Sequence, residues 1–354
     1  MTDRLEAADE AAAVEQLHAL DCTDGLPVIV PTPERVSRMV LASGQAPELV
    51  LGEMGPGRGV ATIEKVAVAA VMAGCLPDYM PLVVAAVTAV IDPVFDLTEM
   101  QATTHCTAPL IIVNGPARHW CGPVASGFGA LGPGHRANAS IGRALRLAMI
   151  NIGGGRPGVS DMALLGHPGK FTYCLAEDEE NSPFPPLHVH LGFEPEDSVV
   201  TVIGAEAPHS VLFSGDGDDP ENHLRLLQML AFGLANLATN NAVLRNGSAV
   251  VVLNPEHAGM IAAAGMSRQQ VAEKICEYAR HPRADIERFA SAFVGSASGE
   301  VLSCFRGPEQ ILVLMAGGTG LYSMVMPSWC AGKHRNSPVS VKVETGQVCE
   351  VPGI

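Results

Sequence analysis

Four short apolar runs, each ending near a turn built from Pro, Gly or Asn, are the clearest repeated pattern along this chain. Apolar strands without polar alternation are typical of sheets that are buried on both faces. Ligands of such sheets bind near the carboxyl ends of the strands. The pattern therefore predicts an α/β fold with mainly parallel or mixed buried sheets and helices on both faces. The runs cover residues 26–30, 109–113, 249–253 and 311–315.

The first and third runs share a further feature, because Pro-Glu follows each of them where a helix would begin. This shared ending indicates two related α/β halves. We expect an N-terminal helix over 1–20, a first half over 21–200 that holds an Arg-rich pocket and an acidic excursion, and a second half over 201–354. The boundary is expected within the acidic, Pro-rich stretch 177–221, which has little helical period.

Helical periodicity and caps predict five longer helices. The apolar tract 80–91 is too short to span a bilayer and is better explained as a buried helix. Ser267 and Gln270 have the spacing of a capping box at the start of the last helix. The predicted helices cover residues 61–73, 82–90, 138–151, 222–238 and 269–280.

Composition and charge narrow the class of protein. The chain is 47% hydrophobic and only 17% charged, which favours a large core and a homo-oligomer that hides part of its surface. Its net charge of −15 argues against nucleic acid or an anionic membrane as a partner. No signal-peptide pattern is visible at the N-terminus, and the nine cysteines lack the spacing of a disulfide framework. We expect a cytoplasmic protein.

One segment has an unusual charge pattern. Residues 101–160 contain five arginines and three histidines but no Asp or Glu, whereas 37 carboxylates in 354 residues would place about six in any 60. A Gly-rich, acid-free segment with arginines is typical of a pocket for a small anionic molecule. An interface or a set of caps for helix C-termini is the alternative. The candidate substrate-binding residues in this acid-free window are Asn114, Arg118, Arg136, Arg143 and Arg146.

Within the window, glycines at 132 and 134 precede a predicted helix, whose N-terminus favours negative charge. Arg136 and Arg143 are seven residues apart and share one face of that helix, with Arg146 beside them. This arrangement predicts a carboxylate or phosphate ligand. The alternative is that the arginines pair with the acidic excursion.

The acidic excursion carries groups suited to proton transfer. Glu177 and His188 are candidate general acid/base residues, with Lys170 as an electrostatic partner. If the segment is a strand, His188 and His190 lie on one side, and with Glu180 they would form a two-His-one-carboxylate site for a divalent metal. A solvated acidic loop is the alternative.

Two further groups are candidates. Cys75, and the neighbouring pair of His105 and Cys106 near the arginines, could supply an activated thiolate, although single cysteines are more often small core residues. Gly318 and Thr319 follow the last apolar run, where backbone N–H groups could close the pocket around an oxyanion. No other cofactor is indicated.

Several strings taken together resemble a group of uncharacterised bacterial proteins associated with the UGSC-like (seleno)protein domain. The resemblance spans roughly 22–345 and implies a separate thiol or selenol protein as a second subunit. This chain has no Cys-Gly-Ser-Cys motif of its own. The strings are DGLPV at 24–28, TPERV at 32–36, ATIEKVA at 61–67, VMAGCLP at 71–77, QATT at 101–104, VNGP at 113–116, NASIGRALRL at 138–147, GHPGK at 166–170, and the segments from AE at 176–177 to SP at 182–183 and PLHV at 186–189.

These observations favour an enzyme that cleaves or hydrates a polar bond in a small anionic or carbonyl-bearing molecule by acid/base chemistry, as a hydrolase or lyase does. One alternative is the substrate-binding subunit of an oxidoreductase that works with the thiol or selenol protein. Another is a non-enzymatic ligand-binding or structural subunit. For the enzyme, we expect the acid-free window and the acidic excursion to meet at one cleft. Arg143 or Arg136 should then lie within reach of 177–188, either in one subunit or across an oligomer interface.

Overall fold

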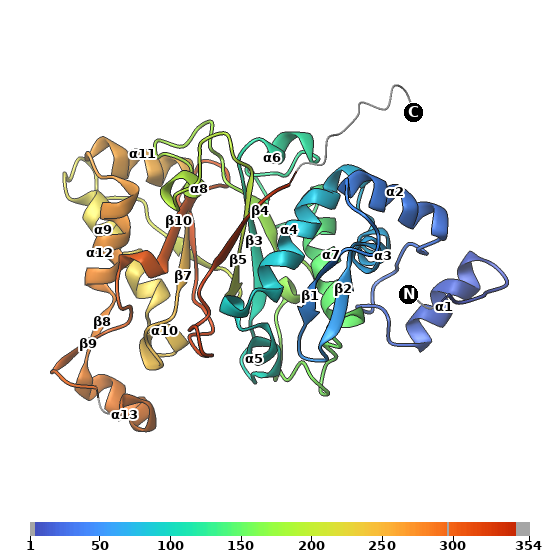
Figure 1. The fold of residues 1–354 in the computed structure, drawn as a ribbon. Coiled ribbons are helices and arrows are strands. Elements are labelled where there is room, and N and C mark those ends of the chain that lie inside the picture. Colours follow the sequence, from blue (N-terminus) through green and yellow to red (C-terminus); the bar gives the residue numbers. More distant parts are fainter. Residues whose placement is uncertain (1–3, 296, 345–354) are drawn as a thin grey trace.

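Two four-stranded sheets pack face to face at the centre of the molecule, and helices cover the outer face of each (Figure 1). The computed structural model describes residues 4–295 and 297–344. The architecture therefore has four layers, in the order helix, sheet, sheet, helix. The α/β fold with mixed sheets predicted from the apolar runs is confirmed.

The first sheet has the strand order β12-β5-β3-β4. Its central strand β3 runs parallel to β4 on one side and antiparallel to β5 on the other. The edge strand β12 then pairs antiparallel with β5. The bounds are β3 Ala108–Asn114, β4 Cys174–Ala176, β5 Val199–Ala205 and β12 Val339–Lys342.

The second sheet repeats this plan in the order β10-β7-β11-β6. Its central strand β7 runs parallel to β10 and antiparallel to β11, and the edge strand β6 pairs antiparallel with β11. Strand β3, rather than the run at 26–30, is thus the counterpart of β7. The bounds are β6 His209–Leu212, β7 Ala249–Leu253, β10 Ile311–Met315 and β11 Tyr322–Met326.

The two halves exchange their edge strands. After β5 the chain leaves the first sheet and forms β6, the edge of the second sheet. After β11 it returns and forms β12, the edge of the first. The two crossing segments touch, because Glu206 N donates to Pro327 O at 2.9 Å and Ala205 bridges Ser328. Each half therefore completes the sheet of the other.

Alternation along the central strands explains the layers. In β3, Leu110 and Ile112 belong to the core between the sheets, while Ile111 and Val113 belong to the core beneath the helices of the first half. Strand β7 divides its apolar side chains in the same way. A strand that is buried on both faces has no side that faces solvent, which is why these runs are apolar without alternation.

Seven of the longer helices form the outer layers, and their sequences carry the expected start and stop signals. Thr62 caps α3 by accepting from Lys65 N, and Gly74 ends it at φ 86°. The capping box predicted for Ser267 and Gln270 is present on α12. Over the first sheet lie α2 Pro33–Ser43, α3 Ile63–Ala73, α4 Met80–Ile91 and α7 Arg136–Asn151, and over the second lie α9 Asn222–Leu234, α11 Pro255–Ala263 and α12 Arg268–Tyr278.

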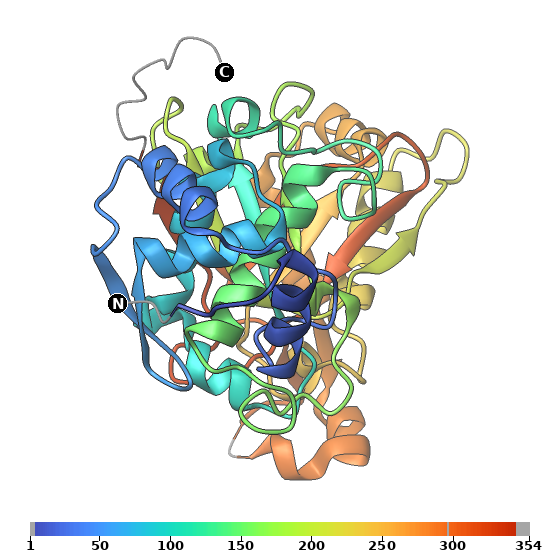
Figure 2. The same cartoon turned by 90° about the vertical axis from the view of Figure 1, so that its right-hand side faces the viewer.

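Shorter elements surround this frame, including two hairpins, β1–β2 and β8–β9. Figure 2 looks onto the helices of the first half, with α1 in front in dark blue. The remaining bounds are α1 Glu10–Ala19, β1 Val50–Met54, β2 Gly59–Thr62, η1 Pro77–Tyr79, η2 Pro93–Phe95, α5 Leu97–Ala102, α6 Ala117–Trp120, η3 Pro168–Lys170, α8 Leu187–His190, α10 Asn240–Val243, β8 Arg280–Pro282, α13 Arg283–Val294, β9 Val301–Ser303 and η4 Pro308–Gln310.

Two expectations need correction against these bounds. Residues 26–30 form no strand, since Pro27 and Pro31 lack an N–H and Ile29 N alone donates to an element of the core, Met72 O. The boundary predicted at residue 200 falls inside β5, and β12 joins the first sheet from the range predicted as the second half. Residues 1–3, 296 and 345–354 of the predicted ranges lie outside the described residues.

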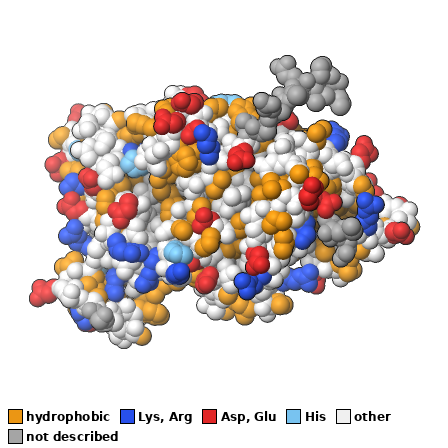
Figure 3. All heavy atoms as spheres, in the orientation of Figure 1, with side chains coloured by type: hydrophobic (Ala, Val, Ile, Leu, Met, Phe, Trp, Pro, Cys, Tyr) orange, Lys and Arg blue, Asp and Glu red, His pale blue; other side chains and the backbone are white. Residues whose placement is uncertain are grey.

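Exposed apolar side chains are interspersed with charged ones on the face in Figure 3. Leu164 and Leu165 are 79% and 98% exposed in one loop. A homo-oligomer that covers such side chains stays a prediction. Among the described residues no single helix is long and apolar enough to cross a membrane; the bent pair 77–91 and 93–102 meets the criterion by length and composition only, and α4 within it is almost wholly buried.

Candidate functional site

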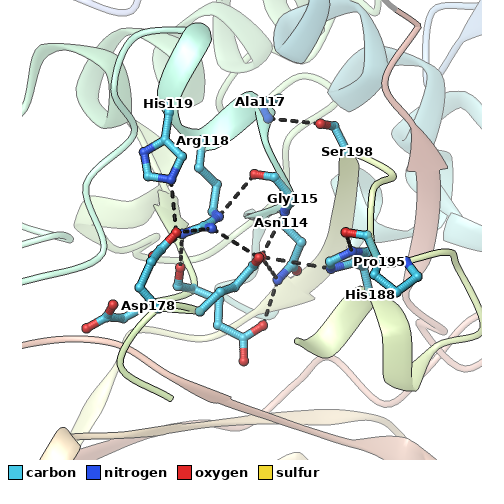
Figure 4. Close-up of polar contacts among 12 residues, drawn as sticks. Asn114, Gly115, Ala117, Arg118, His119, Asp178, His188, Pro195 and Ser198 are labelled. Atoms are coloured by element: carbon cyan, nitrogen blue, oxygen red, sulfur yellow. Dashed lines mark hydrogen bonds and ion pairs between the residues drawn. The ribbon is translucent and has the colours of Figure 1, made fainter. Parts of the chain in front are cut away.

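A cluster of charged and polar side chains lies where β3 and β4 end. Because the two strands are parallel, with Val113 opposite Ala176, the next residues Asn114 and Glu177 come side by side. Asp178 N donates to Met315 O at 2.8 Å, which brings the end of β10 to the same edge. We call the group the strand-end cluster; it comprises Asn114, Arg118, His119, Glu177, Glu179, Glu180, His188 and Arg268. Figure 4 labels Asn114, Arg118, His119 and His188 of this cluster.

The turn after β3 directs the chain into α6, which carries two side chains of this cluster. Gly115 has φ 78°, and a Cβ at this position would lie 2.0 Å from Asp197 O. Only glycine fits there. The turn leads into α6, whose first residue Ala117 donates its N–H to Ser198 Oγ at 2.9 Å. The short helix thereby carries Arg118 and His119 towards the acidic segment (Figure 4).

Arg118 is the centre of the cluster, and every N–H of its guanidinium is used. Nε donates to Gly115 O, and Nη1 donates to Glu177 O and to Glu180 Oε2 at 3.1 and 2.9 Å. Nη2 donates to Glu179 Oε2 and Glu180 Oε1 at 3.0 and 2.7 Å. No donor is left for a ligand. Arg118 therefore positions carboxylates, and the predicted role in substrate binding has no geometric support.

Glu180 and His119 form the accessible part of the cluster. Glu180 Oε1 lies 3.0 Å from His119 Nε2, and the two side chains are 54% and 62% exposed. The hydrogen bonds from Arg118, and then that from His119, lower the pKa of Glu180 from 4.5 to about 2. Glu180 is therefore a fixed anion at neutral pH, and it orients the imidazole.

Glu177 lies in the buried part and is fully enclosed. Its side chain is 0% exposed and accepts from Asn114 Nδ2 at 2.6 Å and from Leu187 N at 2.7 Å. Arg268 Nη2, from α12 of the second half, pairs with its other oxygen at 2.7 Å. Arg268 also donates to Val313 O and to Pro185 O. This enclosure leaves Glu177 no access to a substrate, although it was the predicted acid/base residue.

Glu179 and His188 lie between these two parts. Glu179 Oε1 accepts from Asn114 Nδ2 and Gly115 N, both at 2.8 Å. The imidazole of His188 is wholly buried, with Nδ1 3.8 Å from that carboxylate oxygen and Nε2 3.4 Å from Pro195 O. His188 Nδ1 and Asn114 Oδ1 have no hydrogen-bond partner in the described structure. The cluster contains three glutamates and two arginines, a net charge of −1 with neutral histidines.

The structure thus brings together five of the residues predicted for the site: Asn114, Arg118, Glu177, Glu180 and His188. It also confirms that the acid-free window and the acidic excursion meet, through Arg118 and His119. Within the single chain, the expected contact through Arg143 or Arg136 is not made, and the alternative of a contact across an oligomer interface stays a prediction. Arg143 pairs with Asp24 at 2.7 Å, and Arg136 donates to Gly74 O.

Three other predicted residues lie at the opposite end of the first sheet, before β3 and β4 begin. Lys170 Nζ and Arg146 both contact Asp161, at 2.8 and 3.5 Å. His105 Nε2 lies 2.9 Å from Glu206 Oε1. We call Arg146, Asp161 and Lys170 the strand-start cluster. No polar contact joins the predicted residues Arg146, Lys170 and His105 to the strand-end cluster in the described structure.

Cys75, predicted as a nucleophile, is a buried thiol. It is 6% exposed and contacts Ser140 O through Sγ at 3.3 Å. Burial raises its pKa to about 12, so the thiolate is strongly disfavoured. The geometry supports the alternative of a small core residue.

Gly318 and Thr319 follow β10 at the same edge as the strand-end cluster. The preceding residue, Gly317, donates its N–H to Ser126 O at 2.7 Å. A Cβ on Gly318 would lie 2.0 Å from the ring of Phe128, so the ring packs directly against this glycine. The residues that follow β10 thus pack on a loop of the acid-free window, and among the described residues no contact of Gly318 or Thr319 with a cluster side chain supports their predicted role in binding.

The predicted metal set does not form. His188 and His190 lie on the helix α8 rather than on a strand, so residues two apart point in directions about 200° apart. Burial, and then the charge of Arg268, lower the pKa of His190. Within residues 4–295 and 297–344, no group of three His, Cys, Asp or Glu side chains could hold a metal ion.

Sequence reasoning missed Glu179, Arg268 and the role of His119. Arg268 is 91 residues from Glu177 along the chain and carries no local signal beyond its place after Ser267. Glu179 and His119 belong to segments that were singled out, but nothing in their spacing favours them over their neighbours.

The chain has no match among protein-family models, curated proteins or solved structures.

Proposed function

We propose that the protein is an enzyme that cleaves or hydrates a polar bond in a small, neutral, carbonyl-bearing molecule. His119 is its proton-transfer group, and Glu180 and Arg118 are positioning residues. The supporting observation is the chain of contacts from the Arg118 fork to Glu180 and on to His119 Nε2 at 3.0 Å. A carboxylate that is fixed by arginine and bonded to one imidazole nitrogen sets the tautomer and leaves the other nitrogen for chemistry.

The chemistry follows from this orientation. With the Nε2 proton directed at Glu180, Nδ1 carries the lone pair. Nδ1 takes a proton from water while the water oxygen bonds to the substrate carbonyl carbon, and Glu180 stabilises the imidazolium. The imidazolium then returns the proton to the leaving group as its bond to carbon breaks. In the hydration of an enone, the water oxygen bonds instead to the β-carbon, and the imidazolium returns the proton to the α-carbon, so that no group leaves.

The charge of the cluster supports one of the two predicted substrate classes over the other. The cluster carries −1 with neutral histidines, and Arg118 has no free donor for a carboxylate or phosphate. A neutral substrate is therefore favoured over an anionic one at this edge. The exposed pair of His119 and Glu180 sets the place of attack.

Substrate profiling with matched variants tests the proposal. Esters, lactones, amides and hydratable enones are assayed with the wild type, His119→Ala and the control His209→Ala, an exposed histidine on the edge strand β6. We expect His119→Ala to lose about 10²- to 10⁴-fold in kcat, with partial rescue by added imidazole, and the control to keep its rate. Wild-type rates in His119→Ala would refute the proposal.

A second variant tests positioning. Glu180→Gln keeps the shape of the side chain but removes its charge, so kcat should fall while KM changes little, because Glu180 does not touch the substrate. The oxidoreductase alternative needs an accessible thiol. Cys75 is buried with its pKa raised to about 12, which leaves the partly exposed Cys106 as the predicted thiol of this chain on which that alternative depends.

A further inference from the structure

Arg146, on α7, is an arginine whose hydrogen bonding is incomplete. It is 7% exposed. Nε donates to Lys170 O at 2.6 Å, and Nη1 lies 3.5 Å from Asp161 Oδ2. Nη2 has no partner in the described structure. A buried guanidinium nitrogen without an acceptor costs free energy, so an acceptor is expected beside it.

The strand-start cluster also has a surplus of positive charge. Asp161 is the one carboxylate in contact with Arg146 and Lys170 among the described residues, so two cations share one anion. The nearby His167 adds no charge at neutral pH, since burial lowers its pKa to about 4. Asp24, whose charge also acts on Arg146, is paired with Arg143, and Glu206 is paired with His105. A buried surplus charge is costly unless an anion compensates it.

A small cavity of about 10 Å³ adjoins these groups, and both Arg146 and Lys170 line it. Such a volume holds one particle about the size of a water molecule. Apolar walls come from Pro109, Leu145 and Met149, and no carboxylate lines the cavity. The charged side chains at its surface therefore offer donors only, which suits a compact anion better than a water molecule that must also donate.

We propose that this cavity is a binding site for one monatomic anion of chloride size, held by Arg146 Nη2 and Lys170 Nζ. The anion neutralises the cluster and ties α7 to η3, just before β4. The small volume favours a monatomic anion over phosphate or an organic carboxylate. The site is independent of the strand-end cluster and of the function proposed there.

Two measurements test the site without an activity assay. The first is thermal unfolding in sodium chloride and in sodium methanesulfonate, whose anion is too large to enter, at equal ionic strength. We expect chloride to raise the wild-type Tm saturably by on the order of 2 °C. Lys170→Met, which removes the surplus charge and keeps the contact of Arg146 with Asp161, should lose the chloride effect. Lys274→Met, the same change at a pair on the surface of α12, should keep it.

The second measurement is diffraction at the bromine absorption edge from crystals soaked in sodium bromide. An anomalous peak beside Arg146 and Lys170 is expected. Peaks at other positions would mean an adventitious ion only, and would overturn the proposal. Equal Tm values in the two salts would do the same.

Discussion

The carboxylate of Glu177 and the guanidinium of Arg268 meet at 2.7 Å, and both side chains are almost fully buried, at 0% and 4% exposure. Glu177 follows β4 of the first sheet, while Arg268 begins α12 over the second. The ion pair therefore joins the two halves of the molecule at the edge where the strand-end cluster lies.

We expect Glu177→Gln to lower the free energy of unfolding by about 3–5 kcal/mol, because it leaves the Arg268 charge buried without a partner. Chemical denaturation measures the loss. Glu287→Gln is the matched control, since Glu287 pairs with Arg283 at the surface. Its cost should stay below about 0.5 kcal/mol. Equal costs at the two sites would contradict the importance of burial.

Arg143→Ala should destabilise the protein by about 3 kcal/mol, because it leaves Asp24, whose side chain is 4% exposed, without its partner. Arg143 also donates to the carbonyls of Leu26 and Pro27. In a double-mutant cycle, Asp24→Ala with Arg143→Ala should cost less than the sum of the single changes. If Arg143 instead binds an anionic ligand, as predicted from the sequence, Arg143→Ala should keep the stability of the wild type and lose affinity for that ligand.

Acid should weaken the contacts of Glu180. Its pKa is about 2 in the folded state and 4.5 as a free side chain, so its contribution to stability is present above pH 4.5 and is lost as the pH falls through 2. The side chain is half exposed, which limits the contribution to about 1 kcal/mol. Between pH 5 and 2, the free energy of unfolding should fall less steeply for Glu180→Gln than for the wild type.

His167 should cause a second decline in the free energy of unfolding, at higher pH than the decline caused by Glu180. Burial lowers its pKa from 6.5 to about 4, and Nδ1 accepts from Gly169 N while Nε2 faces Ala205 O at 3.3 Å. As the pH falls, the imidazole is protonated at higher pH in the unfolded chain than in the folded protein. The contribution of His167 to the free energy of unfolding is therefore full above pH 6.5 and declines until about pH 4. His167→Gln should flatten this decline. A slope unchanged between pH 6.5 and 4 would show that His167 does not cause it.

Much of the fold could be predicted from the sequence because it depends on local patterns. Three of the four apolar runs are strands, and the capping box at Ser267 starts a helix, since periodicity and caps act over a few residues. The run at 26–30 satisfied the same pattern but has Pro27 at an interior position and no partner strand. The exchange of β6 and β12 has no local signal, because it is decided by pairing between distant segments.

The candidate site was predictable only in part, for a similar reason. The opposite charges of the acid-free window and the acidic excursion indicated that the two would meet. Which arginine makes the contact depends on partners far along the chain. Asp24 lies 119 residues from Arg143 and binds its guanidinium. The arginine that binds the glutamates is instead Arg118, which follows the turn at Gly115.

The exchange of edge strands has a consequence for synthesis of the protein on the ribosome. When β3, β4 and β5 have emerged, the outer edge of β5 still lacks β12, which comes from residues 339–342. An emerging first half thus exposes an open, apolar strand edge while more than a hundred further residues are translated. Neither half, expressed separately, has all the strands of its sheet. Mixing the two fragments, each carrying the edge strand of the other, should restore both sheets at once or neither.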